Sequence, residues 1–430
     1  MEGDSSPAGS ASASKARRKR HATEAAAVVA SLALVMLGLV LAHGGDDGDV
    51  ALVPTDRSSS VPSTSGAIGA GTTAPSTRSA PSTRVPELPG PDEIRLAFAG
   101  DLLTHLPLVG VAEQYGRPRG ARYDFGPMLA PMEPILESAD VAICHLEVPL
   151  AADQDAISGY PAFGAPTELV DAIDAAGYDG CSTASNHSLD QGRTGLDATL
   201  DALDGAGLGH AGTARTGTEG ATTTFYEIDG AKVAHLSYAY DFNGYKIPGD
   251  APFAVNQIDA ERIAADARTA RERGAQLVVL SLHWGTEYQH EPSQYQRDVV
   301  SLVLPSPDID VIVGHHAHVV QPIEKVGDTY VVFGLGNQLA NQPEVPRSDG
   351  LTVVLRAAKQ ADGRYEVSAI DAIPTFVDTT TYRVLPIGRT LDSPGSGGDL
   401  RATLEASYER TAAIIAGTPT EGVSLVGRSG

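Results

Sequence analysis

Three histidines lie within four positions of one another, where His315, His316 and His318 follow the apolar run VIVG. Imidazole nitrogens are common ligands of transition metals, and three histidines so close together are hard to explain as core packing. In extended backbone, side chains two positions apart point to the same side of the strand, so His316 and His318 should face one site. This stretch predicts metal binding.

Other residues with oxygen or nitrogen donors also follow apolar runs. Asp101 and His105 lie in AFAGDLLTH, Glu147 lies in CHLEVPL, and His283 ends LSLH. A carboxylate so close to a buried strand is costly unless it is paired or binds a metal. Structural explanations remain open: Asp101 could cap a helix, Glu147 could lie at a loop mouth, and His283 could be a hydrogen-bonded core residue.

The stretch STASNHSLDQG places an asparagine and a histidine side by side after another apolar run. Asn186 can offer an amide oxygen to a metal, and His187 can donate a proton or bind a metal. Asp190 can hold His187 in one tautomer, so His187 and Asp190 form a candidate catalytic pair. Alternatively, Asn186 or Ser188 only caps the helix that follows.

Together these residues form the mixed oxygen and nitrogen ligand set of a two-metal hydrolytic centre. We therefore expect divalent ions, two in number, with manganese, iron, zinc and magnesium all compatible. The donors must be positioned by the strands that precede them, which we expect at residues 94–100, 140–147, 178–185, 232–240, 275–283, 308–316 and 329–336. Helical patterns separate several of these strands, at residues 125–139, 167–177, 196–207 and 257–273.

Strands that alternate with helices predict an α/β fold with a largely parallel, buried sheet. Ligands bind such sheets at the carboxyl ends of the strands, where these polar residues lie. After Gly350 the pattern turns to β-structure, and a last helix is expected from about 399 to 416.

The chain has 430 residues, of which 42% are hydrophobic, so it can bury a sizeable core. Its net charge of −23 disfavours a nucleic-acid partner, because an acidic surface repels phosphate backbones. Two cysteines exclude a cysteine-rich zinc domain. Cys144 and Cys181 fall in neighbouring predicted strands, and the sequence leaves open whether they pair or remain buried thiols.

The N-terminal region has three parts. Residues 1–24 form a basic tail, expected in the cytoplasm, and residues 25–42 are apolar without a charge, as in a single transmembrane signal anchor. A cleaved signal peptide is the alternative, which would make the protein secreted. Residues 43–91 are rich in Ser, Thr, Pro and Gly and are expected to be a disordered linker. Both alternatives place the rest of the chain outside the cytoplasm.

The sequence resembles the bacterial capsule-synthesis CapA family, the poly-γ-glutamate synthesis proteins, which is related to the calcineurin-like metallophosphatases. The resemblance covers roughly residues 94–345. It is carried, in the family's order, by FAGDLLTH, the HLE of CHLEVPL, the long block around ASNHSLDQG, LSLHWGTEY, VIVGHHAHVVQPIE and FGLGNQLANQ. It implies a four-layer α/β/β/α sandwich, which we expect over residues 92–390, followed by a C-terminal helix and tail at 391–430.

The resemblance also implies roles for individual residues. His187 would be the acid of the transition state, and Glu147 stands where the phosphatases use a bridging Asp. The implied metal ligands are Asp101, His105, Glu147, Asn186, His283, His316 and His318. His145 departs from the family, which usually has Asn there, and could be an extra ligand or a substitution beside the site. His105 lies four residues after Asp101 rather than two, and His315 is the less certain histidine of its stretch.

These features predict a membrane-anchored, metal-dependent hydrolase or transferase with its domain outside the cell membrane. It would act on an anionic cell-surface polymer, poly-γ-glutamate or polysaccharide, together with other capsule synthesis proteins. The alternatives are a non-catalytic polymer-binding export factor and a generic secreted metallophosphoesterase.

Overall fold

The computed structural model describes residues 92–228, 230–393 and 398–427. The predicted basic tail, membrane anchor and linker at 1–24, 25–42 and 43–91 lie outside these residues. Of the helices in the described part of the chain, none combines the length and apolar character needed to cross a bilayer.

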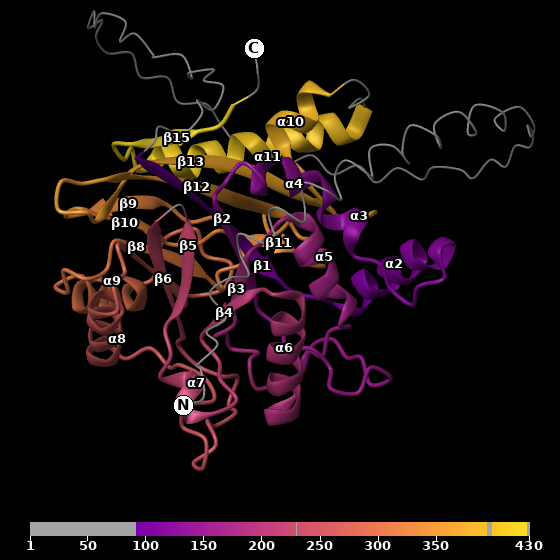
Figure 1. The fold of residues 1–430 in the computed structure, drawn as a ribbon. Coiled ribbons are helices and arrows are strands. Elements are labelled where there is room, and N and C mark those ends of the chain that lie inside the picture. Colours follow the sequence, from indigo (N-terminus) through magenta and orange to yellow (C-terminus); the bar gives the residue numbers. More distant parts are fainter. Residues whose placement is uncertain (1–91, 229, 394–397, 428–430) are drawn as a thin grey trace, which may run out of the picture. The chain divides into compact units, whose positions relative to one another are not determined.

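Two β-sheets face one another in this part of the chain (Figure 1). The first sheet has the order β14 (Arg383–Pro386), β13 (Tyr365–Asp378), β12 (Asp349–Lys359), β1 (Glu93–Leu102), β2 (Val141–Leu146), β3 (Gly180–Ser182), β4 (Gly209–Ala211), with β11 (Asn337–Leu339) beside β1 and β15 (Val423–Leu425) beside β13. The second sheet has the order β5 (Thr224–Ile228), β6 (Ala231–Ala239), β7 (Leu277–His283), β8 (Val311–His315), β10 (Thr329–Val332), β9 (Ile323–Val326).

Each sheet contains a block of parallel strands. In the first sheet β1 to β4 run parallel, whereas β12, β13 and β14 pair antiparallel. In the second sheet β6, β7, β8 and β10 run parallel, and the edge strands β5 and β9 are antiparallel. The predicted α/β fold with parallel strands is confirmed, and the strands divide between two mixed sheets.

The parallel strands are apolar on both faces, which explains why they can lie between two layers. In β1, Leu96 and Phe98 point into the core between the sheets, while Ala97 and Ala99 face a separate core. The inter-sheet core continues with residues such as Val313 of the second sheet.

Helices cover the outer face of each sheet, giving four layers (Figure 1). The outer core of the first sheet contains α2 (Leu106–Gly116), α3 (Gly126–Leu129), α4 (Glu133–Leu136), α5 (Glu168–Ala176) and α6 (Gly192–Ala206). The second sheet is covered by α8 (Ala260–Glu272) and α9 (Gln294–Val303). The remaining short helices are α7 (Gly217–Gly220), the 3₁₀ turns η2 (Arg117–Arg119) and η3 (Ala130–Met132), and α10 (Ile387–Asp392).

The C-terminal segment packs against the first sheet. Helix α11 (Gly398–Gly417) places Ile415 in the inter-sheet core, and Arg410 makes two hydrogen bonds with the carboxylate of Asp349, at 2.7 and 2.8 Å. Strand β15 then pairs with β13. The stretch 391–430 is therefore integrated into the two-sheet structure over its described residues.

Candidate metal centre

The register of the two sheets brings the predicted site residues together at the carboxyl ends of the parallel strands. In the first sheet Asp101, His145 and Ser182 are neighbours across β1, β2 and β3. In the second sheet His283 and His315 are neighbours across β7 and β8. The remaining predicted residues lie just beyond these strand ends, so donors from both sheets converge on one site.

Asp101 contacts two histidine rings and a backbone amide. It is buried in β1, with Oδ1 3.3 Å from His315 Nδ1 and Oδ2 3.1 Å from His318 Nδ1. The backbone N–H of His316 donates to Oδ2 at 3.2 Å. Burial alone would raise the pKa of Asp101, but the close imidazoles of His315 and His318 outweigh it and hold the pKa well below its usual value. Asp101 caps no helix, because His105 occupies the N-cap position of α2.

The histidines after β8 reach the site through an unusual backbone. His316 and His318 have φ values of 88° and 54°, so they lie in the left-handed region and not in extended backbone. The expectation that an extended strand aligns them is wrong, because β8 ends at His315. The turn nevertheless brings both rings to the site, with centroids 6.0 Å apart. Such backbone costs on the order of 1–3 kcal/mol and persists where surrounding contacts fix it.

Glu147 lies directly after β2 and is buried without hydrogen bonds. Neither carboxyl oxygen accepts one from any residue that the structure describes. Its Oε1 lies 3.7 Å from His318 Nε2 and 3.9 Å from His283 Nε2. Burial raises the pKa of Glu147 well above its usual value. Burial would lower the pKa of His318, but the carboxylates of Glu147 and Asp101 outweigh it and raise the pKa to about 9.

Asn186 and His283 connect the two sheets. The Oδ1 atom of Asn186 lies 2.9 Å from Nε2 of His283, and its amide donates to Oδ1 of Asn243 at 3.3 Å. Asn243 follows β6 and has a φ of 51°. Asn186 therefore presents its oxygen toward His283, and it does not cap the next helix, whose N-cap is Gln191.

His187 and Asp190 form a pair at the edge of this cluster. The two residues are joined between Nδ1 and Oδ2 at 2.7 Å, and Oδ2 also accepts the backbone N–H of Phe163 at 2.7 Å. The ring of Phe163 packs edge-on against His187, with centroids 4.8 Å apart. The Nδ2 atom of Asn243 lies 3.3 Å from His187 Nδ1. These contacts fix the orientation of the imidazole and direct its Nε2 away from Asp190.

His105 is the predicted ligand that the structure does not bring into the cluster. Its Nδ1 accepts a hydrogen bond from the backbone N–H of Asn341 at 3.2 Å, and its ring packs edge-on against Phe163. Burial lowers the pKa of His105 to about 4. Three residues lie between the end of β1 at Leu102 and the start of α2 at Leu106, and His105, the last of them, takes the N-cap position of α2.

Two buried groups in the described residues have the side-chain types and spacing of metal sites. Asp101, His145 and His315 form one group, and Glu147, His316 and His318 form the other. Five buried donor atoms in these groups have no hydrogen-bond partner in the described structure: Asp101 Oδ1, Glu147 Oε1, Glu147 Oε2, His315 Nδ1 and His316 Nδ1. Carboxylates and imidazoles are suitable ligands for divalent cations, so the residues fit the predicted metals.

A third group, Asp204, His210 and Glu219, differs in its environment. It is partly exposed, and Arg215 makes ion pairs with both of its carboxylates. The guanidinium already neutralises these acids, so we assign no metal to this group.

Three residues, His145, His315 and Asn337, contribute more to the site than the sequence alone indicates. His145 and His315 stack with ring centroids 4.0 Å apart, and His318 Nδ1 lies 3.0 Å from Oδ1 of Asn337. Asn337 lies in the block FGLGNQLANQ, and the strand β11 that carries it pairs with β1 at Asp101. That pairing could not be read from the sequence, because β11 has only three residues.

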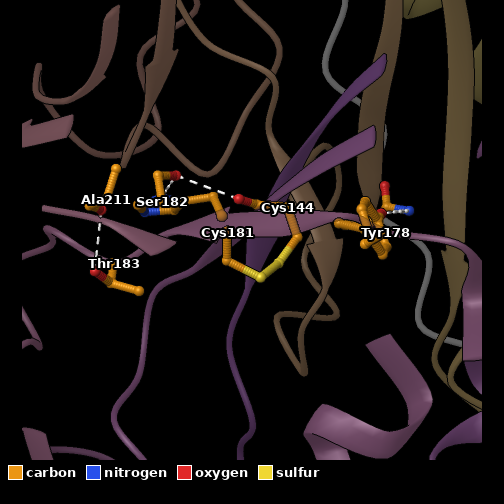
Figure 2. The surroundings of a disulfide bond; sticks show 8 residues. Cys144, Tyr178, Cys181, Ser182, Thr183 and Ala211 are labelled. Atoms are coloured by element: carbon orange, nitrogen blue, oxygen red, sulfur yellow. Dashed lines mark hydrogen bonds between the residues drawn. A yellow bond between two sulfur atoms is a disulfide. The ribbon is translucent and has the colours of Figure 1, made fainter. Parts of the chain in front are cut away.

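The two cysteines form a disulfide beside the site. Cys144 and Cys181 are register partners on β2 and β3, with Cα atoms 4.4 Å apart (Figure 2). Cys144 immediately precedes His145 in the sequence, and Cys181 immediately precedes Ser182, and both of these following residues lie at the site. Figure 2 also shows Ser182, whose Oγ donates to the Cys144 carbonyl at 3.3 Å.

Comparisons with known proteins identify relatives that share this part of the chain. The chain is 26% identical over 284 residues to the PGA biosynthesis protein CapA of Bacillus subtilis, covering 65% of this chain and 72% of that protein. It is 24% identical over 261 residues to the capsule biosynthesis protein CapA of Bacillus anthracis, covering 58% of this chain and 61% of that protein. Among solved structures, the calcineurin-like phosphoesterase YfkN of Bacillus subtilis aligns with 14% identity over 75% of this chain and 97% of that chain, with a TM-score of 0.40.

Residues 95–342 match the family model described as bacterial capsule synthesis protein PGA_cap. This match spans more than half of the chain and includes every strand end that contributes a donor to the two buried groups. The chain belongs to the bacterial capsule synthesis protein PGA_cap family.

Proposed function

We propose that this chain is a divalent-metal-dependent hydrolase that processes an anionic polymer during capsule synthesis. The observation that carries the proposal is Glu147, which is buried, has no hydrogen bond to its oxygens, and faces His283 and His318. A bare carboxyl in such a position costs free energy unless it is kept for a ligand.

The residues that would hold the ions come from both sheets. Asp101 and His315 would hold one ion, and Glu147, His316 and His318 would hold the other. Asn186 and His283 complete the set of donors. When bound, such ions act as Lewis acids and lower the pKa of a bound water, which makes hydrolysis possible near neutral pH.

His187 would be the proton donor to the leaving group. Because Asp190 accepts the hydrogen of Nδ1, the other ring nitrogen is the one available to exchange a proton with a substrate. The backbone N–H of Phe163 and the ring of Phe163 hold this pair in place. Asp190 thus acts by positioning His187.

The substrate class follows from the family and from charge. The matched relatives are named for PGA and capsule biosynthesis, so we propose a polymer of that kind, with a phosphoester or a γ-glutamyl amide as the bond cleaved. The protein carries a net charge of −23, so bound cations would be needed to attract an anionic chain. Other proteins of capsule synthesis would be its partners.

We also propose that the domain lies outside the cytoplasm, tethered by residues 25–42 and the linker at 43–91. The uncharged apolar stretch behind a basic tail supports an anchor with the positive side in the cytoplasm. The Cys144–Cys181 disulfide supports an oxidising compartment.

The test uses the full chain, purified with and without added Mn²⁺. Bound metal is measured by elemental analysis, and cleavage is assayed on an aryl phosphodiester and on a γ-glutamyl amide oligomer. His187→Ala should retain the metal and lose turnover by about 100-fold or more, as expected for a general acid, whereas His316→Ala should lose metal. The proposal is refuted if the wild type binds no stoichiometric divalent metal or if His187→Ala cleaves at the wild-type rate.

A further inference from the structure

Both ring nitrogens of His145 are already engaged by neighbours. Nδ1 lies 2.8 Å from Oγ of Ser182, and Nε2 lies 2.9 Å from Nδ1 of His283. The side chain is completely buried. A histidine in this environment has no free nitrogen with which to bind an ion, although its position beside Asp101 and His315 would otherwise suit a ligand.

We infer that His145 is a positioning residue that selects the tautomer of His283 and thereby leaves Nε2 of His283 free to bind a metal. This inference rests on the proposed metal dependence. It concerns a position where the sequence departs from the family resemblance, since His145 stands in place of the usual Asn.

Nε2 of His283 is the ring nitrogen that would bind the metal. This atom faces Oδ1 of Asn186 at 2.9 Å and Oε1 of Glu147 at 3.9 Å, so it points into the cluster of donors. For its lone pair to be available, the proton of the neutral ring must sit on Nδ1. A metal-binding histidine almost always donates that second N–H to a fixed acceptor. The acceptor here is Nε2 of His145.

The position of the proton on Nδ1 of His283 determines the direction of the other hydrogen bonds in this series. If Nε2 of His145 accepts, its proton is on Nδ1 and is donated to Oγ of Ser182. The hydroxyl of Ser182 then donates to the carbonyl oxygen of Cys144 at 3.3 Å (Figure 2). Each donor has one acceptor, and the chain ends on a backbone carbonyl that needs no proton of its own.

The side chains of His283, His145 and Ser182 can also be satisfied without a cation. The hydroxyl of Ser182 then donates to Nδ1 of His145, Nε2–H of His145 donates to His283, and Nε2–H of His283 donates to Oδ1 of Asn186. Binding at Nε2 of His283 therefore needs only a reversal of the direction of these hydrogen bonds. The bond from His283 to Asn186 is exchanged for the bond from the Ser182 hydroxyl to the Cys144 carbonyl, so the number of hydrogen bonds stays the same and the cost of occupying the site is low.

His283, His145 and Ser182 form a hydrogen-bonded relay. The backbone that carries His145 and Ser182 is held at two points. His145 and Ser182 are register partners on β2 and β3, and the residues before them are joined by the disulfide. The distance between the imidazole and the hydroxyl is therefore set by the sheet and by a covalent bond. The relay is a built feature of the first sheet that acts on a histidine of the second sheet.

The test measures Mn²⁺ binding to the full chain by calorimetry and elemental analysis. His145→Asn should bind the same number of ions as the wild type with about 10- to 100-fold weaker affinity, the range typical when the partner of a ligand is removed. Ser182→Ala should weaken affinity in the same direction, and adding it to His145→Asn should have little further effect. Unfolding of the metal-free variants is measured alongside, and Ser182→Ala provides a smaller perturbation if His145→Asn folds poorly.

His235→Asn is the matched control. His235 is also fully buried and has its Nε2 3.0 Å from a serine hydroxyl, that of Ser281, but it lies outside the two metal groups. It should leave Mn²⁺ affinity unchanged.

Two results would overturn the inference while leaving the proposed function intact. Loss of one ion per chain in His145→Asn would make His145 a direct ligand, and wild-type affinity in both His145→Asn and Ser182→Ala would remove its role. A wild type that binds no Mn²⁺ would refute the proposed function itself, together with this inference.

Discussion

Replacing Glu147 by leucine should make the metal-free protein more stable while abolishing its response to metal. Glu147 is buried and its two carboxyl oxygens accept no hydrogen bond from the described residues. The ring nitrogens of His318 and His283 lie 3.7 and 3.9 Å from Oε1, beyond hydrogen-bond distance. The wild-type fold therefore carries an unsatisfied polar group, and leucine of similar volume removes it.

The magnitude follows from the cost of leaving a buried polar group unpaired, which is about 1–3 kcal/mol. The free energy of unfolding in a chelator should rise by about that amount in Glu147→Leu. At roughly 2 °C per kcal/mol for a domain of this size, the melting temperature should rise by a few degrees. In the presence of metal at about 1,000 times its dissociation constant the order should reverse, because binding then stabilises the wild type by about 4.1 kcal/mol.

The assay is urea and thermal unfolding of both proteins, in chelator and in Mn²⁺. Glu227→Leu serves as control, since Glu227 is exposed on the edge strand β5 and its replacement should change stability by less than about 0.5 kcal/mol. If Glu147→Leu were less stable than the wild type in chelator, Glu147 would have a structural partner and the reasoning would be refuted.

Two further predictions concern residues near the site and in the second sheet. A Cβ at Gly314 would lie 1.9 Å from the carbonyl oxygen of Phe333, so Gly314→Ala should destabilise the fold by about 3 kcal/mol in urea unfolding. Gly205→Ala in α6, where nothing lies within 4 Å, should instead stabilise it by about 0.5–1 kcal/mol, and equal effects of the two would contradict the packing argument. Burial lowers the pKa of His235 from 6.5 to about 3, so the unfolded chain binds one more proton in that interval. Its contribution to stability is therefore fully present above pH 6.5 and falls by about 1.4 kcal/mol per unit as the pH is lowered toward 3. His235→Asn should flatten the pH dependence of unfolding by one proton, and an unchanged slope would show that His235 is already protonated in the folded state.

Much of the strand and helix order could be predicted, because the local signals agree with the fold. Helices α5 and α6 end at Gly177 and Gly207, both of which adopt the left-handed conformation that the sequence pattern anticipates. The predicted helix at 125–139 is broken into α3, η3 and α4, since prolines recur within it. Helix α9 was missed, although Ser293 and Gln296 form a capping box that marks its start.

The sequence predicts which residues form most of the candidate site, but it does not predict which of them contact one another. Donors at the ends of parallel strands converge because strand ends meet at one edge of a sheet, which a pattern of apolar runs reveals. The same pattern says nothing about which sheet a strand joins. Contacts across the sheets, such as His145 with His283 and Asn186 with Asn243, therefore needed the three-dimensional structure. The displacement of His105 from the cluster likewise depends on where α2 begins.

The division of the donors between two sheets makes the apolar layer between those sheets a spacer that sets the ligand geometry. Phe98 and Val313 lie in that layer, four and two residues before the ends of β1 and β8, and neither carries a donor atom for a metal. A one-residue slip of a strand moves its side chains by about 3.3 Å, which is more than the length of a metal–ligand bond. Substitutions that make Phe98 or Val313 larger or smaller would therefore change the distances between the metal ligands while the protein remained folded. Every ligand residue would still be present in the sequence.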